Sequence, residues 1–444
     1  MVLRCHIPVR AGIASRDAAV GSGLLPDPGV PADLGPRPSR SVFRPACRFP
    51  AGLMEHRRDV ALLALARFGR SIAAGMINLA FPYFILTRFH HGALVLGLIY
   101  VAATLAGAGL SLLVGVGADV WGRRGTLVAA NLLLPLSALM VYLSHSLWLV
   151  VPAAMLGGYS STGSLGGGGV GGVAQPVQSV VLAQLTPHRE RTRYFSLFTF
   201  LAGAAGALGA LLTKLLAVHD IFLVAAIVSA AGIPLLWSIR VDPPVRASLA
   251  SLRTKTTIGK FTLTGMLNGF SQGLVVPFLI PFFIMVYRLP KSEMSVFAFT
   301  AGALGAVSIL GAPLLERKLG FLRSILLTRG ITLAMFLAFP FIRFLPASAM
   351  IYIVAPSLRV AGLPIQQSEL TKRVDEGEMG RALGINRVAR LMATSAGIGV
   401  SGHLMDAAHF EVPFLLYGLV MTGNLMLYVR FFSDGSRPAG GNGI

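Results

Sequence analysis

Arginines that fall deep within long apolar segments are the residues of this chain whose type and position most directly suggest chemistry. Arg70 lies about ten residues into the first such segment, or roughly 15 Å along a helix that rises about 1.5 Å per residue, and Arg359 lies near the middle of a later one. An ionisable side chain at such a depth is costly and marks a candidate functional site. Uncharged polar side chains extend the set. We predict a binding cavity formed by Arg70, Asn78, Tyr159, Asn268, Gln272 and Arg359.

Several of these polar positions have a second explanation. Arg67, Arg387 and Arg390 lie closer to the ends of their segments, where a long side chain can reach the headgroups of a membrane. The two deep arginines are too far inside for that, and for them a cavity position and a structural position both stay open. Asn268 and Gln272 are also of the type that joins neighbouring helices by hydrogen bonds.

Carboxylates are missing from the middle of every apolar segment. Those nearest to the segments lie in loops or towards segment ends, at Asp119, Glu190, Glu316, Glu369 and Asp406. Proton-coupled carriers usually employ a buried carboxylate with a raised pKa. Deep arginines without deep carboxylates therefore favour a small anionic or polar ligand.

Composition shows what kind of element must hold these residues. Of 444 residues, 54% are hydrophobic and 13% are charged, and the mean hydropathy is +0.72. Soluble domains carry about 25% charged residues, so the sequence predicts an integral membrane protein. The net charge of +20 does not indicate nucleic-acid binding, because the basic residues lie in short loops between apolar segments.

Twelve segments have the roughly 20 mainly apolar residues that a helix needs to cross a bilayer. Lys and Arg gather in the loops at one end of them, and this end is expected to be cytoplasmic. Both termini are then cytoplasmic, since the number of spans is even. The predicted spans are 60–86, 92–114, 125–144, 147–185, 195–217, 220–239, 258–287, 293–313, 322–342, 348–370, 382–405 and 411–432.

Four parts follow from this pattern. We predict a first six-helix bundle at 54–239, a basic cytoplasmic linker at 240–257, a second six-helix bundle at 258–432 and a cytoplasmic tail at 433–444. The sequence thus predicts an all-α membrane protein of two six-helix bundles.

The first 53 residues differ from the rest. They are rich in Pro and Arg, hold both cysteines, Cys5 and Cys47, and contain no apolar stretch long enough to span a membrane. Two interpretations stay open: a disordered extension, or sequence upstream of a true start at Met54. We favour the second. A structural disulfide is not expected.

The two predicted bundles resemble each other, as expected for a transporter built from repeats. Three matches carry this: Pro82 with Pro281 at an offset of 199, Gly122 with Gly320 at 198, and Gln178 with Gln366 at 188. The change of about ten residues indicates a glycine-rich insertion at about 164–173, inside the overlong fourth span. Glycine weakens helices, so this insertion is either a substrate-facing segment or a lengthened loop without contact to substrate.

One loop between the second and third spans packs small and charged residues together. It reads Gly115-Val-Gly-Ala-Asp119-Val-Trp-Gly122-Arg123-Arg124, and its second-half counterpart holds Glu316, Arg317 and Gly320. The first stretch resembles the loop between helices 2 and 3 of the major facilitator superfamily, G-x-x-x-D-R-x-G-R-R/K. Val120 replaces the arginine of that pattern.

The resemblance implies two six-helix bundles around a central cavity, with access that alternates as one bundle rocks against the other. It also implies that Asp119 engages the start of helix 11, near Gly380 and Arg381, since a helix N-terminus stabilises a carboxylate. Arg123 and Arg124 would hold the loop at the anionic inner leaflet. The arginine in helix 4 and the proline in helix 5 that mark proton-coupled drug exporters are missing, which weakens a drug:proton antiporter.

The leading hypothesis is a secondary transporter, without cofactor or metal, for a small anionic or polar metabolite. A multidrug or amphiphile efflux carrier is the alternative among transporters. A non-transporting solute sensor or a membrane enzyme are the alternatives from other classes, although the common hydrolase, metal and phosphate motifs are missing. The expected partners are the solute, the lipid bilayer and a coupling ion that the sequence does not identify, with no nucleic acid. We expect a monomer in a bacterial plasma membrane.

Overall fold

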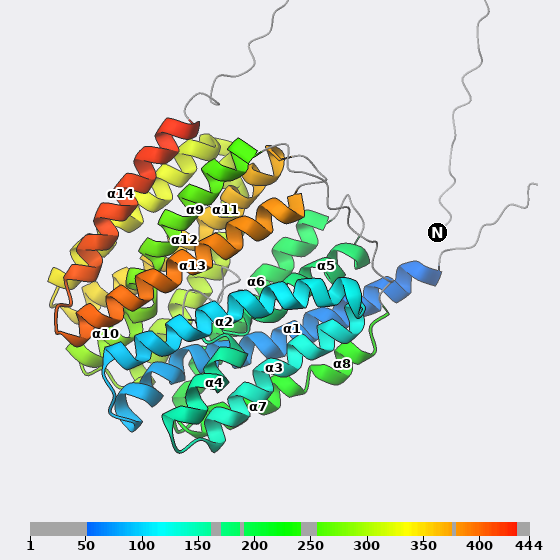
Figure 1. Cartoon of the computed structure of the whole chain (residues 1–444), viewed down its shortest axis with the longest axis horizontal. Helices are drawn as coiled ribbons and strands as arrows, with labels where there is room; N and C mark the ends of the chain where they lie inside the picture. Colours follow the sequence, from blue (N-terminus) through cyan, green and yellow to red (C-terminus); the bar gives the residue numbers. More distant parts are fainter. Residues whose placement is uncertain (1–50, 161–169, 187–190, 241–254, 375–378, 433–444) are drawn as a thin grey trace, which may run out of the picture. The chain divides into compact units, whose positions relative to one another are not determined.

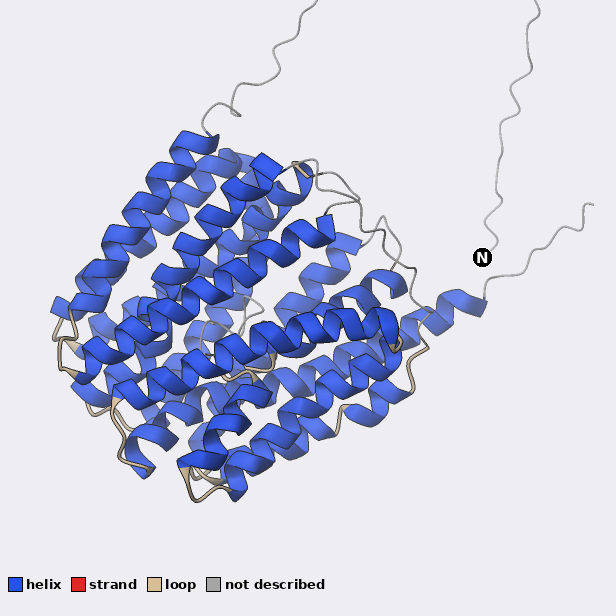
Figure 2. Cartoon of the chain, viewed as in Figure 1, coloured by secondary structure: helices blue, strands red, loops and turns tan. Residues whose placement is uncertain are grey.

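The computed structural model describes residues 51–160, 170–186, 191–240, 255–374 and 379–432, and these residues are almost entirely helical, with no β-strand among them (Figure 1, Figure 2). Apolar segments favour helices in lipid because a helix satisfies its backbone N–H and C=O groups within one segment. In chain order the α-helices are α1 (Ala51–Tyr83), α2 (Ala93–Val120), α3 (Arg123–Leu143), α4 (Leu147–Gly157), α5 (Gln175–Leu185), α6 (Arg191–Leu212), α7 (Asp220–Ala230), α8 (Ile233–Trp237), α9 (Lys255–Val275), α10 (Leu279–Val286), α11 (Lys291–Ala338), α12 (Leu345–Lys372), α13 (Met379–Asp406) and α14 (Val412–Phe432). Short π or 3₁₀ turns flank them: η1 (Phe84–Arg88), η3 (Gly172–Ala174), η4 (Thr213–Leu215), η5 (Val276–Phe278) and η6 (Phe339–Phe341).

Nine helices in these ranges are long and apolar enough to cross a membrane. One of them, α11, consists of two helices that meet at Gly320, whose backbone is left-handed (φ 74°, ψ 171°). The predicted fourth span comprises α4 and α5, and most of the predicted glycine-rich insertion, residues 164–169, lies outside the described residues. The all-helical membrane fold is therefore confirmed, whereas the count of twelve spans and the cytoplasmic position of both termini stay predictions. Residues 1–50, most of the linker and the tail also lie outside the described residues.

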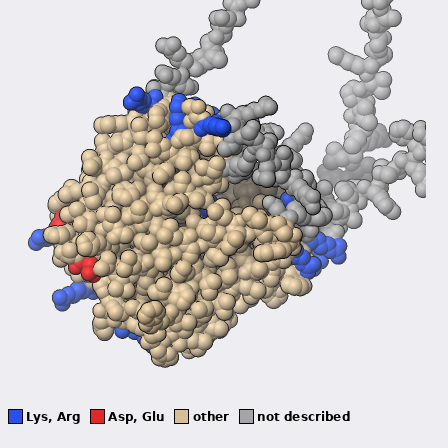
Figure 3. Space-filling model, viewed as in Figure 1, with Lys and Arg blue, Asp and Glu red and all other residues tan. Residues whose placement is uncertain are grey.

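The surface matches a membrane environment. On the face that Figure 3 shows, Lys, Arg, Asp and Glu lie towards the ends of the helices and leave a broad uncharged area between them. Large apolar side chains stand out from the helices, with Trp148 91% and Leu419 73% exposed. Hydrocarbon solvates such side chains at no cost, whereas water does not.

The helices divide into two groups by their contacts. In the first group, α1–α8, α1 packs against α6 and α7, and α3 packs against α4 and α7. In the second group, α9–α14, α9 packs against α13 and α14, and α11 packs against α12 and α14. The most extensive contacts between the groups are those of α2 with α13 and of α6 with α11 (Figure 1).

Buried apolar side chains are distributed differently at the two ends of the helices. We call the end with Gly122 and Gly320 the inner end and the end with the α1–α2 connection the outer end, after the predicted orientation. Towards the outer end one core joins both groups, with Phe84 from the first and Phe339 from the second. At the inner end each group has its own core, around Leu127 in the first and Phe261 in the second.

The predicted internal repeat is present in the turns at the inner end. Gly122 and Gly320, 198 residues apart, both have a positive φ, at 90° and 74°. Four residues after each, a hydroxyl donates a hydrogen bond back to the glycine carbonyl: Thr126 to Gly122 (2.9 Å) and Ser324 to Gly320 (2.7 Å). The same local sequence thus builds the same turn in both groups.

The repeat extends to the closest helix contacts. A Cβ placed on Gly209 of α6 would lie 2.0 Å from the carbonyl oxygen of Ile72 in α1. A Cβ on Gly397 of α13 would lie 2.2 Å from the carbonyl oxygen of Phe270 in α9. Ile72 and Phe270 are 198 residues apart, whereas Gly209 and Gly397 are 188 residues apart. The offset between the repeats therefore falls by ten somewhere between α1 and α6, as predicted for the fourth span.

Polar contacts at helix ends also join the two groups at the outer end. Lys291, which begins α11, donates from Nζ to the carbonyl oxygens of Thr213 (2.6 Å) and Leu216, which begin and follow the turn η4 after α6. Asp406, which ends α13, accepts from the backbone N–H of Leu94 in the first turn of α2 (3.3 Å). A cation at a helix C-terminus and an anion at a helix N-terminus are each stabilised by the helix dipole. The two contacts hold the outer end closed.

Replacing Lys291 with methionine is expected to open the outer end more often. A hydrogen bond to a charged group contributes about 1.5 to 3 kcal/mol, which we reduce to about 1 to 2 kcal/mol because Lys291 is half-exposed. The open population should rise roughly fivefold to thirtyfold. The measurement is the rate at which an impermeant maleimide, added from outside, labels a cysteine at Leu79, after Cys5 and Cys47 are changed to serine.

Lys214 offers a matched control, because it is exposed and lies at the same end. Lys214→Met should label at the parental rate. Equal labelling rates in both methionine variants would show that Lys291 does not hold the outer end.

Candidate functional site

A cavity of about 820 Å³, including its open mouth, lies between the two groups. Its walls come from α1 and α6 of the first group and from η5, α10, α11 and α12 of the second. Most lining side chains are small or apolar. We call it the central cavity and define it by its polar residues Asn78, Tyr352, Ser357 and Arg359 together with Leu79 and Ile280.

Arg359 is the charged group among the described residues that line the central cavity. The residue is only 5% exposed, and its Nε and Nη1 are buried without a hydrogen-bond partner in the described structure. A buried charge without partners costs several kcal/mol. Such an unpaired guanidinium is expected in a binding site where the ligand supplies the hydrogen-bond acceptor.

Prolines shape the helix that carries Arg359. Pro356 and Pro364 lie inside α12, and each lacks the N–H that would bond the carbonyl four residues earlier. For Pro356 that carbonyl belongs to Tyr352, one turn before Pro356. Ser357 is fixed, because its hydroxyl donates to Ala301 (3.1 Å) and Ile353 (2.7 Å). The helix that carries Arg359 thus has, at Tyr352, a carbonyl oxygen that lacks its usual helical donor.

The other predicted cavity residues lie elsewhere, apart from Asn78. Tyr159 is fully buried in the first group, and its hydroxyl accepts a hydrogen bond from Ser137 (3.0 Å). Asn268 and Gln272 are buried on α9, which packs against α13, as their alternative role in helix contacts would require. None of these three lines the central cavity.

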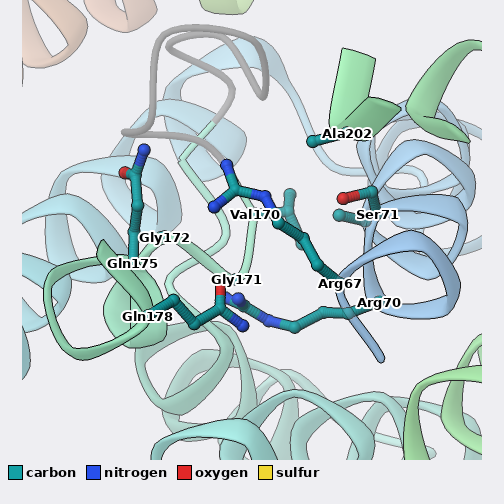
Figure 4. Close-up of a pocket in the computed structure, with 10 residues that line it drawn as sticks. Arg67, Arg70, Ser71, Val170, Gly171, Gly172, Gln175, Gln178 and Ala202 are labelled. Atoms are coloured by element: carbon teal, nitrogen blue, oxygen red, sulfur yellow. The ribbon is translucent and has the colours of Figure 1, made fainter. Parts of the chain in front are cut away.

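Arg70 lines a second cavity, of about 460 Å³ including its mouth, which we call the inner arginine pocket. It is built by α1, η3, α5 and α6, and it is defined by Arg67, Arg70, Ser71, Gly171, Gln175 and Gln178 (Figure 4). The two arginines are one helical turn apart on α1, and the two glutamines are one turn apart on α5. The predicted set of deep residues is thus divided between two cavities.

The loop motif has a local structural role at several positions. Gly122 has the left-handed backbone that ends α2 and starts α3. Arg124 donates to the carbonyl oxygen of Trp237, and its guanidinium lies 5.4 Å from the centre of that indole ring. Gly115 lies within α2, and Arg123 begins α3. The side chain of Asp119 and those of Gly380 and Arg381 lie outside the described residues.

In the second-half counterpart, Gly320 makes the equivalent turn, Arg317 is exposed, and Glu316 is half-buried. The positions proposed for the conformational role of the two loops therefore lie on matching turns of the inner end.

Arg329, which is 3% exposed in α11, is a buried arginine outside the set of predicted residues. Its guanidinium donates to Asn424 (2.8 Å) and Gln366 (2.8 Å) and lies 4.7 Å from the centre of the Tyr428 ring. The internal repeat in the sequence could have identified Arg329 as a candidate. Arg329 lies 198 residues after Asn131, which accepts a hydrogen bond from Gln178, the repeat partner of Gln366.

The sequence profile of the Major Facilitator Superfamily matches residues 63–367. The chain belongs to the major facilitator superfamily. No curated protein sequence matches it. Its structure is similar to those of other family transporters, and at these identities the similarity concerns the fold.

Three solved structures illustrate this similarity. The human organic anion transporter MFSD10 (TETRAN) has a TM-score of 0.63 and 14% identity, over 84% of this chain and 99% of the other. A mutant form of the nucleoside transporter NupG has a TM-score of 0.68 and 12% identity, over 84% of this chain and 100% of the other. The D-xylose-proton symporter has a TM-score of 0.67 and 15% identity, over 85% of this chain and 98% of the other. This major facilitator protein is therefore a multi-pass membrane protein and a secondary transporter rather than an enzyme.

Proposed function

We propose that this major facilitator protein carries a small organic anion with one negative charge across the plasma membrane, with Arg359 as the residue that binds the anionic group. The observation that carries the proposal is the buried guanidinium of Arg359, which faces the central cavity with two nitrogens unpaired in the described structure. A carboxylate is the group with which a guanidinium forms its strongest hydrogen bonds.

The walls of the central cavity support a substrate with an apolar body. Around the single guanidinium, aliphatic side chains such as Leu79, Leu279 and Ile280 dominate the lining. A substrate with several charges would leave some of them without partners in this cavity, at a high cost. An aromatic or branched aliphatic carboxylate matches one cation and apolar walls.

The proposed transport cycle uses the two helix groups as the moving parts. With the basic end in the cytoplasm, the shared outer core and the separate inner cores correspond to an inward-facing state. Binding of the anion neutralises Arg359 and makes closure over the cavity less costly. In this proposal the Gly115–Arg124 loop helps to hold the opposite state, as the family resemblance implies. We further propose a bacterial protein that works as a monomer.

Changing Arg359 to glutamine is expected to reduce uptake of the transported carboxylate by about 10- to 100-fold, because a charge-assisted hydrogen bond is lost. A thermal-shift screen of the purified protein against aromatic and aliphatic carboxylates, sugars, amino acids and lipophilic cations selects the solute, since ligands that bind the folded state raise the melting temperature. Flux of that solute into proteoliposomes then measures the loss.

The same variant separates binding from folding. Without ligand, Arg359→Gln should melt at or above the parental temperature, because an unpaired buried charge is removed. Arg430→Gln, at an exposed arginine of α14, should transport normally. Full transport by Arg359→Gln would refute the anion site. Stabilisation by lipophilic cations would favour amphiphile efflux, and binding without flux would favour a sensor.

A further inference from the structure

We infer that the inner arginine pocket is a second anion site, separate from the central cavity, and that it takes a compact anionic group. That group is either a free inorganic anion such as phosphate or the carboxylate of a second substrate molecule. The inference does not depend on the substrate proposed for the central cavity, because the two cavities have different linings.

Charge is the first argument. Arg67 and Arg70 lie one turn apart on α1, and no carboxylate is among the described residues that line the pocket. The Nε of Arg70 is buried without a hydrogen-bond partner in the described part of the chain. Two like charges at this spacing repel each other, and an anion bound between them converts this repulsion into attraction.

The groups that surround the two arginines leave their charge unneutralised. The guanidinium of Arg67 lies 5.7 Å from the centre of the Phe198 ring. Gln178 donates its amide N–H to Asn131 (3.1 Å), and Figure 4 shows Gln178 and Arg70 pointing toward one another. Preorganised donors of this kind lose little entropy when a ligand binds.

Glycine gives the guanidinium of Arg70 its room. Gly171 has a φ of 73°, and a Cβ at this position would lie 3.0 Å from Arg70 Nη2. Any side chain at Gly171 would therefore push the guanidinium away and strain the backbone. Gln175 also lines the pocket, and its side-chain amide carries N–H groups that can donate to an anion.

Position separates the pocket from the central cavity. Every described residue that lines it belongs to the first group, whereas the central cavity is lined by both groups. On α1 the two cavities meet between Ala74 and Gly75, so they occupy successive turns of one helix. A movement of one group against the other changes the central cavity, whereas the residues that line the inner arginine pocket all move with the first group, although Arg387 of α13 donates to the carbonyl oxygen of Gly172 (3.4 Å).

The test compares three glutamine variants in the full-length protein: Arg70→Gln in the pocket, Arg359→Gln in the central cavity, and Arg58→Gln at an exposed position of α1. Sodium phosphate is titrated at constant ionic strength, and binding is measured by calorimetry and by thermal shift. The Kd of phosphate should rise about tenfold or more in Arg70→Gln. It should change less than about twofold in the other two variants, where no phosphate ligand is lost.

Several results would overturn the second site. These are unchanged phosphate affinity in Arg70→Gln, an equal loss in Arg58→Gln, or an equal loss in Arg359→Gln, which would indicate one continuous site. A monodisperse elution profile and partial binding by Arg70→Lys show that the pocket variant is folded.

Stoichiometry distinguishes the two sources of the anion. If the carboxylate selected in the thermal-shift screen binds twice per parental chain and once per Arg70→Gln chain, the second substrate molecule occupies the pocket. If the carboxylate binds once per chain in both the parental protein and Arg70→Gln, phosphate or another inorganic anion occupies the pocket. Phosphate binding that depends on Arg70, in a protein that binds no carboxylate, would reject the proposed function and keep the second site.

Discussion

Methionine in place of Arg329 is expected to lower the melting temperature of the detergent-solubilised protein by on the order of 10 °C. The guanidinium joins three helices, because Arg329 in α11 donates to Gln366 of α12 and to Asn424 of α14. Asn424 in turn donates to the backbone of Thr264 in α9 (2.7 Å). Removal of Arg329 leaves two buried amide oxygens without donors and loses the cation–π contact with Tyr428, for a cost of about 3 to 5 kcal/mol.

Two further variants give this prediction its contrast. Arg430→Met, at an exposed position, should change the melting temperature by less than about 2 °C. Arg329→Lys should fall between, because one ammonium keeps the charge but cannot match the guanidinium fork. If Arg329→Met and Arg430→Met have the same melting temperature, the hydrogen bonds of Arg329 do not stabilise the second group. Arg329 and Arg359 are therefore expected to act in opposite senses on stability, although both are buried arginines of the second group.

A single methyl group at Gly273 is expected to destabilise the second group by more than about 3 kcal/mol, because the contact overpacks backbone against backbone. A Cβ at this position of α9 would lie 2.1 Å from the carbonyl oxygen of Thr394 in α13. Neither atom can move without separating the two helices. Unfolding of Gly273→Ala by guanidinium chloride or by heating measures the loss in the free energy of unfolding.

The matched control lies on the same helix. A Cβ at Gly259 meets nothing within 4 Å, so Gly259→Ala should be neutral or more stable by up to about 1 kcal/mol, since alanine is the better helix former. Equal stability of the two alanine variants would mean that α9 and α13 are farther apart than the structure shows. The repeat predicts the same loss for Gly75→Ala in the first group, where a Cβ would lie 2.0 Å from the carbonyl oxygen of Gly206.

The fold could be predicted from the sequence because its signals are long and redundant. Apolar length, loop charge and the motif around Gly122 each indicate a multi-span transporter, and the repeat offsets reappear in the contacts of Gly209 and Gly397. The number of spans is harder to obtain from pattern alone, since the fourth span is interrupted and α11 runs through Gly320.

The candidate site could be predicted only in part. Counting residues gives the depth of Arg70 and Arg359 but not the direction each faces around its helix, so one cavity was expected for two arginines that line different cavities. Tyr159 shows the same limit, because a tyrosine at cavity depth is buried equally well against Ser137. Tyr352 and Ser357 line the central cavity without any charge or motif to distinguish them in the sequence.

The shared outer core makes the direction in which the cavity opens sensitive to temperature. Opening the outer end would expose buried aromatic side chains at the contact between the groups, such as Tyr83, whose hydroxyl donates to the carbonyl oxygen of Leu289, and Phe278, which lies beside Gly97 of α2. Exposure of apolar surface raises the heat capacity, so the free-energy difference between the two access states curves with temperature. Cooling weakens apolar burial and therefore favours the state with an open outer end. The inner end, whose cores lie within each group, can close or open with a smaller change of this kind.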